Sequence, residues 1–85
     1  MKNQYFIILN HELKQFCVLE PKYSSRKEEL LTMFRKSYGS NNIEIYGTNP
    51  EFVSSEIENE QLKGYSQKHF TDWKPYFNPS ITASN

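Results

Sequence analysis

Two short runs of consecutive apolar residues near the start of the chain, each bounded by polar residues, predict β-strands. From Gln4 to Asn10 both alternating faces are apolar, which is typical of a central strand with both sides of the sheet covered. A second strand is predicted from Gln15 to Glu20, and Pro21 ends it because proline has no main-chain N–H to donate. The short link at 10–14 predicts a hairpin, so we expect the two strands to be antiparallel neighbours.

The stretch from Ser25 to Tyr38 has the strongest helical pattern in the chain. Leu30, Phe34 and Tyr38 recur at four-residue spacing and form one apolar stripe. Ser25 and Glu28 have the spacing of a capping box, in which each side chain accepts a hydrogen bond from a main-chain N–H at the helix start. Because the opposite face is charged, we predict that this helix lies on the sheet with its polar side in water, rather than acting as a recognition helix.

A third strand is predicted from Ile43 to Gly47, where apolar and polar residues alternate as they do near a sheet edge. The helix between the second and third strands can return the chain across the sheet in a right-handed crossover. The predicted sheet order is therefore 2-1-3, with the two-sided first strand in the centre. The fold class is α+β: a small single domain with a β-β-α-β core in a split β-α-β arrangement.

Residues 50–62 predict a second, short helix. A cap residue, a proline and an acid follow one another from Asn49 to Glu51, which is typical of a helix start, and Gly64 suits its end. The alternation from Val53 to Asn59 is also compatible with a strand. We favour the helix.

Aromatic residues crowd the stretch from Tyr65 to Phe77, without a clean helical or strand period. A sheet whose central strand is apolar on both faces needs a second cover, so we expect this stretch to lie over the face that the first helix leaves bare. The alternative is that these aromatics form an interface with a partner or with a second copy. We place a single domain at residues 1–77 and a polar, flexible C-terminal tail at 78–85.

The composition is typical of one small soluble domain. The 85 residues include 20 of Leu, Ile, Val and Phe, enough for one modest core. Cys17 is the only cysteine, so no disulfide within the chain is possible, and no apolar run reaches membrane-spanning or signal-peptide length. These observations predict a cytoplasmic protein. The chain has 36 residues of Phe, Tyr, Met, Ile, Asn and Lys against 10 of Gly, Ala, Arg and Pro, which fits the AT-rich coding of some bacterial genomes or of their phages and mobile elements.

Charge is unevenly distributed along a chain that is neutral overall. Ten basic and ten acidic residues cancel, so the whole molecule has no net attraction to nucleic acid. Residues 39–62, however, carry five glutamates and no Lys or Arg, whereas the flanking segments are net basic. Such an acidic block is either a solvated helix face or a ligand for a basic groove on a partner.

Candidate catalytic and metal-binding residues are few. His69 and Asp72 stand three apart and His11 precedes Glu12, but a catalytic zinc needs three protein ligands and a structural one usually four. Cys17 has no second cysteine or local histidine pattern beside it, so we interpret it as a small buried hydrophobe. We therefore predict no metal, no cofactor and no enzymatic activity. The remaining enzymatic alternative is a small RNase-like toxin, which would draw on His11, Glu12, Arg35, Tyr38 and His69.

The leading hypothesis is a non-enzymatic protein-binding module of the inhibitor or antidote type, of phage or bacterial mobile-element origin, which occludes a basic, nucleic-acid-binding surface of another protein. Its predicted partner-binding residues are Glu51, Glu56, Glu58, Glu60, Tyr65, Phe70, Trp73 and Tyr76. Trp73 is the expected anchor, because tryptophan is enriched among residues that dominate binding energy. We expect no membrane partner, and a homodimer is compatible with this hypothesis. The alternative is a nucleic-acid-binding protein that uses the basic end of the first helix together with Lys68, Lys74 and the aromatic residues.

Overall fold

The two-sided strand β1 (Tyr5–Asn10) lies in the middle of the sheet in the computed structural model of the chain, which describes residues 4–73. It is antiparallel to both of its neighbours, β2 (Gln15–Leu19) and β3 (Ile43–Thr48). A short fourth strand, β4 (Ser66–Gln67), pairs in parallel with the start of β2, which gives the sheet order β3-β1-β2-β4. The predicted order of the first three strands is confirmed, and β4 is an addition that the sequence did not predict.

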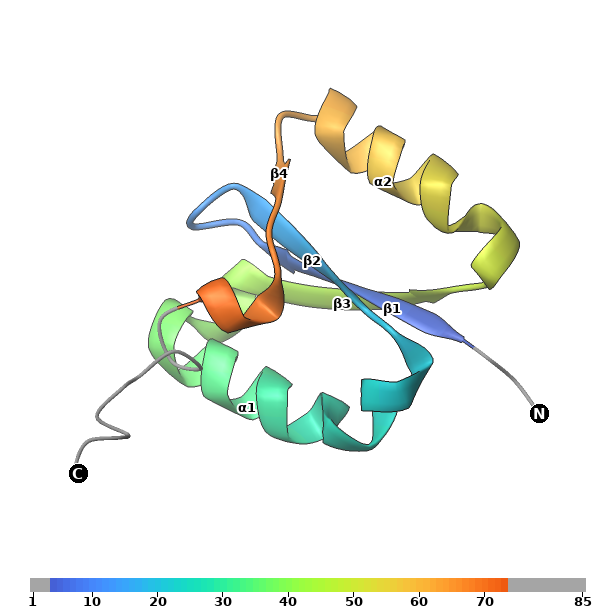
Figure 1. The fold of residues 1–85 in the computed structure, drawn as a ribbon. Helices are drawn as coiled ribbons and strands as arrows, with labels where there is room; N and C mark the ends of the chain where they lie inside the picture. The colour runs from blue at the N-terminus through green and yellow to red at the C-terminus, as the bar shows by residue number, and fades with distance from the viewer. Residues whose placement is uncertain (1–3, 74–85) are drawn as a thin grey trace.

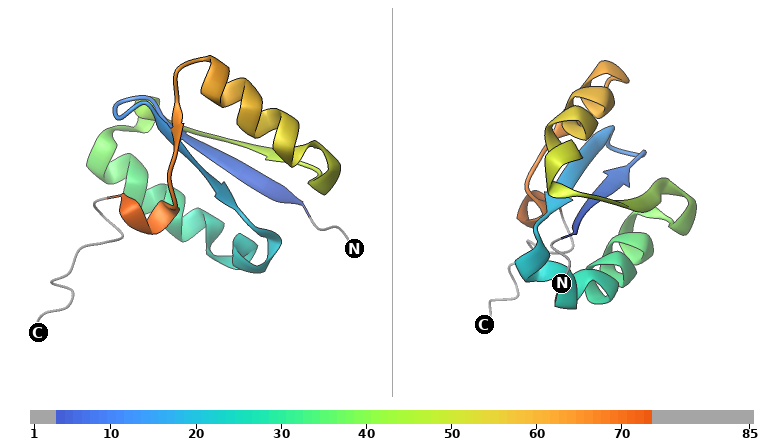
Figure 2. Two further views of the ribbon diagram at one scale, coloured as in Figure 1. Left: turned by 45° about the horizontal axis from the view of Figure 1, so that its top comes forward. Right: turned by 90° about the vertical axis from the view of Figure 1, so that its right-hand side faces the viewer.

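Two helices cover the two faces of this sheet. α1 (Lys27–Tyr38) connects β2 to β3 and lies on one face, and α2 (Val53–Leu62) follows β3 and lies on the other (Figure 1; Figure 2). Because β2 and β3 are both antiparallel to β1, they run in the same direction, and β2-α1-β3 forms the predicted split β-α-β unit. The second helix is confirmed over the alternative strand. Within residues 4–73, no helix is long and apolar enough to cross a membrane.

The larger core lies between α1 and the sheet. Its buried residues come from β1, β2, β3, α1 and the chain after β4: Ile8, Cys17, Leu19, Leu30, Leu31, Phe34, Ile43, Phe70 and Trp73. The ring of Phe34 packs edge-to-face against that of Trp73, with centroids 4.7 Å apart, a geometry that adds to the gain from burial. The end of the described chain therefore closes this face together with α1.

A smaller core lies between α2 and the opposite face of the sheet. Its members are the buried Ile7, Leu9 and Phe16, with the partly buried Val18, Tyr46, Ile57 and Tyr65 packed around them. Of the residues in α2, Ile57 is the one that joins this cluster. The second face thus has a thinner apolar cover than the first.

The aromatic stretch after α2 corrects one prediction. Tyr65 packs on the second face, but Phe70 and Trp73 are buried in the α1 core. β4 runs along the outer edge of β2 and carries the chain from the α2 side to the α1 side (Figure 1). The prediction that the whole stretch covers the second face is therefore wrong, because α2 already occupies that face. The predicted domain boundary at residue 77 lies outside the described residues.

α1 begins later than its sequence pattern predicts. Pro21–Arg26 forms a 3-10 helix that runs directly into α1 at Lys27. Ser25 therefore already lies within a helical turn, and no side chain caps α1 at Arg26. A serine caps a helix from an extended position, so the predicted capping box between Ser25 and Glu28 does not form.

The turn between β1 and β2 is fixed by one buried side chain. Oδ1 of Asn10 accepts hydrogen bonds from the main-chain N–H groups of Glu12 and Leu13, at 3.0 and 3.1 Å. Asparagine commonly closes turns in this way. Lys14 then takes a left-handed conformation, with φ at 57°, before β2 begins. The predicted hairpin is confirmed.

Replacing Phe34 with alanine is expected to lower the free energy of unfolding by about 3–5 kcal/mol, because it leaves a cavity where a fully buried ring contacts Trp73. Chemical denaturation followed by circular dichroism measures the change. The matched control is Lys36→Ala on the exposed side of the same helix, which should change stability by less than about 0.5 kcal/mol. Equal stability of wild type and the Phe34 variant would contradict the placement of α1 over the core.

Candidate functional site

α2 presents an acidic side to solvent. Ser55, Glu58 and Leu62 are exposed in α2, and their spacing of three and four residues places them along one side of the helix. Glu51 is exposed in the 3-10 turn Pro50–Phe52 that directly precedes α2. Leu62 is 83% exposed, and Phe52, at the turn before α2, is 52% exposed. We refer to Glu51, Ser55, Glu58 and Leu62 as the outer face of α2. This face combines negative charge with apolar surface that remains in water.

The inner side of α2 uses its carboxylates within the fold. Glu60 is 3% exposed, and its Oε2 atom accepts a hydrogen bond from the Tyr46 hydroxyl at 2.8 Å. The same hydroxyl lies 3.3 Å from Oε1 of Glu56, and Nζ of Lys63 lies 3.7 Å from Oε2 of Glu60. Burial, together with the two carboxylates, raises the pKa of Tyr46 above its ordinary value of 10.0. Glu60 therefore holds α2 on the sheet and offers almost no surface to a partner.

The aromatic residues that the sequence assigns to a partner interface lie mostly inside the fold. Phe70 is 2% exposed and Trp73 is 0% exposed. Trp73 also donates a hydrogen bond from Nε1 to Oε1 of Gln15 at 3.1 Å, which ties the end of the described chain to β2. Tyr65 is partly buried, and Tyr76 lies outside the described residues. Trp73 is a core residue in this fold, and it has no exposed surface with which to anchor an interface.

Three side chains form a hydrogen-bonded cluster that sequence reasoning missed. Nε2 of His11 lies 2.8 Å from Oε1 of Glu44, and Nδ1 of His11 is hydrogen-bonded to the hydroxyl of Tyr65. Nζ of Lys14 lies 5.5 Å from the centre of the Tyr65 ring. Glu44 and Tyr65 are 33 and 54 residues from His11 in sequence, so no spacing rule connects them.

The order of hydroxyl, imidazole and carboxylate in this cluster resembles that of a nucleophile with its base and orienting acid. When Nε2–H donates to Glu44, Nδ1 is free to accept the proton of Tyr65. Catalysis also needs a cavity in which a substrate meets the reactive group, and the groove described next is not lined by any of the three residues. The cluster partners of His11 are Glu44 and Tyr65 rather than the members of the predicted toxin set. We interpret the cluster as a cross-link between the β1–β2 turn, β3 and the chain before β4.

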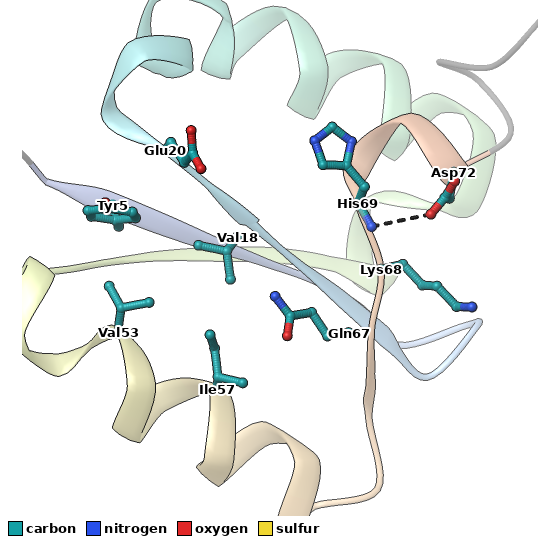
Figure 3. A pocket seen from close by; sticks show the side chains of 9 residues that line it. All are labelled: Tyr5, Val18, Glu20, Val53, Ile57, Gln67, Lys68, His69 and Asp72. Carbon is teal, nitrogen blue, oxygen red and sulfur yellow. Dashed lines mark hydrogen bonds between the residues drawn. The ribbon is translucent and has the colours of Figure 1, made fainter.

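A groove of about 540 Å³ lies between α2 and the chain that follows β4, over the end of β2 (Figure 3). Its lining consists of Tyr5, Val18, Glu20, Val53, Ile57, Gln67, Lys68, His69 and Asp72. The mainly apolar side chains come from β1, β2 and α2, and the polar ones come from residue 20 and residues 67–72. A volume of this size is within the range of ligand-binding sites, which combine an apolar surface with a few polar groups.

The groove includes an open edge of β2. β4 pairs with Gln15 and Phe16, and the main-chain N–H of Lys68 then donates to the Phe16 carbonyl at 2.8 Å. Main-chain groups of alternate residues point to the same side of a strand, so those of Val18 point toward the β4 side, as those of Phe16 do. Within residues 4–73 no strand lies beside Val18 on that side. A main-chain donor and acceptor therefore face the groove.

The spacing of His69 and Asp72 in the sequence would suit half of a metal site. In the structure the two side chains instead cap the 3-10 helix Phe70–Asp72. Oδ2 of Asp72 accepts from the main-chain N–H of His69, and Nδ1 of His69 accepts from that of Thr71, both at 3.3 Å. In the part of the chain that the structure describes, no three His, Cys, Asp or Glu side chains gather into a group that could hold a metal ion.

Cys17 is fully buried, and burial raises its pKa to about 12, so the thiol stays protonated.

Comparison of the chain with known protein families, curated proteins and solved structures gives no match. Two surfaces of the described chain are accessible to a partner: the outer face of α2, which is acidic and partly apolar, and the groove beside the open edge of β2.

The contact between Tyr46 and Glu60 makes stability sensitive to alkaline pH. Because the pKa of Tyr46 is raised in the folded state, its contribution to stability is complete below the ordinary pKa of 10.0 and is lost as the pH rises above it. Tyr46→Phe has no such proton, so its stability is expected to fall less steeply than that of wild type between about pH 10 and pH 12. Chemical denaturation of both proteins across this range measures the difference. Equal slopes would show that the Tyr46 hydroxyl does not lie among the carboxylates of α2.

Proposed function

We propose that this protein is a small, non-enzymatic binding module that occludes a basic surface of a partner protein, in the manner of inhibitors and antidotes of phages and mobile elements. The observation that carries the proposal is the outer face of α2, where Glu51 and Glu58 are exposed along with Leu62. The glutamates offer charge complementarity to a basic partner. Leu62 offers apolar surface whose removal from water favours association.

The proposed contact set differs from the one expected from the sequence. Glu51 and Glu58 stay in it because they are exposed, and Phe52 and Leu62 join it for the same reason. Glu56 lies at its margin, because it is partly buried and close to Tyr46. The residues that leave the set because they are buried are Glu60, Phe70 and Trp73.

Charge and apolar contact are expected to act on different steps of binding. Exposed charges at the rim of an interface mainly change the association rate and its dependence on salt. Buried apolar contacts mainly change how long the complex lasts. The two glutamates should therefore speed the encounter with a basic surface, and Leu62 with Phe52 should prolong it.

The nucleic-acid alternative is less well supported. It depends on the basic end of α1, on Lys68 and Lys74, and on aromatic rings on which bases could stack. Lys74 lies outside the described residues. Lys68 is exposed, but Phe70 and Trp73 are buried and present no ring to a base. The acidic outer face of α2 would also repel phosphates. These observations favour a protein partner.

Reversing both Glu51 and Glu58 to lysine tests the proposal. The immobilised wild-type protein is expected to retain a basic protein from an extract of the cells that carry the gene, identified by mass spectrometry. The double reversal should associate with that protein about tenfold more slowly at low salt, because it replaces attraction by repulsion. Stopped-flow association rates at several salt concentrations measure the effect.

The matched control is the double variant Glu12→Lys with Glu28→Lys, which adds the same charge at exposed positions outside α2. It should bind at nearly the wild-type rate, and thermal melts establish that all three proteins are folded. Equal slowing by both double variants would contradict a role for the outer face. Retention of the wild type by single- or double-stranded nucleic acid in a salt-dependent manner would support the alternative instead.

A further inference from the structure

We propose that the groove between α2 and residues 67–72 binds an extended peptide segment of the partner protein, which adds to the open edge of β2 at Val18. The inference rests on the proposed function, since it assumes a protein partner, but it concerns a surface separate from the outer face of α2. The expected segment places an apolar side chain in the groove and basic side chains on either side of it.

The main-chain geometry selects an extended segment. The N–H and C=O of Val18 point to the side where β4 pairs with the start of β2, and that pairing ends at Phe16. An added strand would continue the position of β4 and supply a donor and an acceptor to Val18, which has no strand partner on this side within residues 4–73. The added pairing stays short, because the Glu20 carbonyl already accepts a hydrogen bond from the Tyr23 N–H at 2.9 Å.

The side chains of the groove select an apolar residue at its centre. Figure 3 shows Val53 and Ile57 pointing from α2 toward Val18 on β2. All three are only partly buried, so apolar surface on each remains in contact with water. An apolar side chain that enters the groove would remove this surface from water along with its own.

The charges around the groove select basic neighbours for that residue. Glu20 and Asp72 both line it and are both exposed, and the one lysine in the lining, Lys68, points away from the other lining residues in Figure 3. Nζ of Lys22 lies 3.8 Å from Oε1 of Glu20, but an exposed ion pair of this kind contributes little to stability. The rim thus has two exposed carboxylates that attract lysine or arginine side chains of a peptide, and Oδ2 of Asp72 also accepts from the main-chain N–H of His69.

Titration of the isotopically labelled full chain with a defined peptide tests the proposal by NMR. The probe is the acetylated and amidated hexapeptide Lys-Val-Lys-Val-Lys-Val. The amide signals of Val18, Gln67 and Lys68 are expected to shift with saturable dependence on peptide concentration. A second peptide with the same side chains, but with alternate main-chain nitrogens methylated, keeps the charge and loses the donors. It should leave these signals unchanged.

A pair of variants on adjacent residues of α2 provides the matched control. Val53→Lys places a positive charge in the groove, where it repels the lysines of the hexapeptide. It should raise the dissociation constant of the hexapeptide at least about tenfold. Ser54→Lys adds the same charge at an exposed position that does not line the groove, and should change it less than about twofold. Equal effects of the two variants would overturn the proposal.

Three other results would also overturn it. Equal binding of the methylated peptide would show that no strand is added. Shifts confined to Glu51 and Glu58 would show attraction to the outer face of α2 alone, which leaves the proposed function standing. Shifts of the Val18 amide with protein concentration, in the absence of peptide, would identify a second copy of the chain as the occupant. Conversely, hexapeptide binding that the Glu51 and Glu58 reversals do not weaken would support the groove even if the outer face has no partner.

Discussion

The fold depends on a central strand that is apolar on both of its faces. Ile7 and Ile8 are adjacent in β1, both have no exposed surface, and each belongs to a different core. Since successive side chains of a strand point to opposite faces, this pair requires a layer on each side of the sheet. α1 and α2 supply those layers, and β2 and β3 pair with the two edges of β1.

The second of these layers explains both candidate surfaces. α2 brings few apolar residues to its face of the sheet, with Ile57 in the core and the Tyr46–Glu60 hydrogen bond beside it. Glu58 of α2, together with Glu51 in the turn before it, is exposed to water and gives the outer face its negative charge. Because α2 covers the end of β2 incompletely, the apolar surface of Val18 and the open strand edge remain accessible in the groove. A partner segment seated in the groove would cover the apolar surface of Val18 that the described residues leave exposed.

Local patterns in the sequence were sufficient for three strands, both helices and the strand order, because strand alternation, helical spacing and connection length each depend on neighbouring residues. They were not sufficient for β4, whose residues Ser66 and Gln67 have no hydrophobic pattern and are extended because β2 offers them an edge. The burial of Trp73 likewise follows from the side of the sheet to which β4 leads the chain. In the candidate site, the exposure of Glu58 could be predicted because a charged residue in an acidic stretch usually faces water. The burial of Glu60 could not, because it depends on Tyr46, which lies fourteen residues away in the sequence.

Native-state hydrogen exchange, followed at single amides by NMR, tests most directly whether β1 is closed on both sides while β2 is open at one residue. The structure predicts that Ile7 and Ile8 exchange only through global unfolding, with a free energy equal to that from chemical denaturation. Along β2, the amides of Cys17 and Leu19 point to β1 and should be protected, whereas that of Val18 between them should exchange rapidly. Protection of Val18 equal to that of Cys17, or exchange of Ile7 well before global unfolding, would contradict this account.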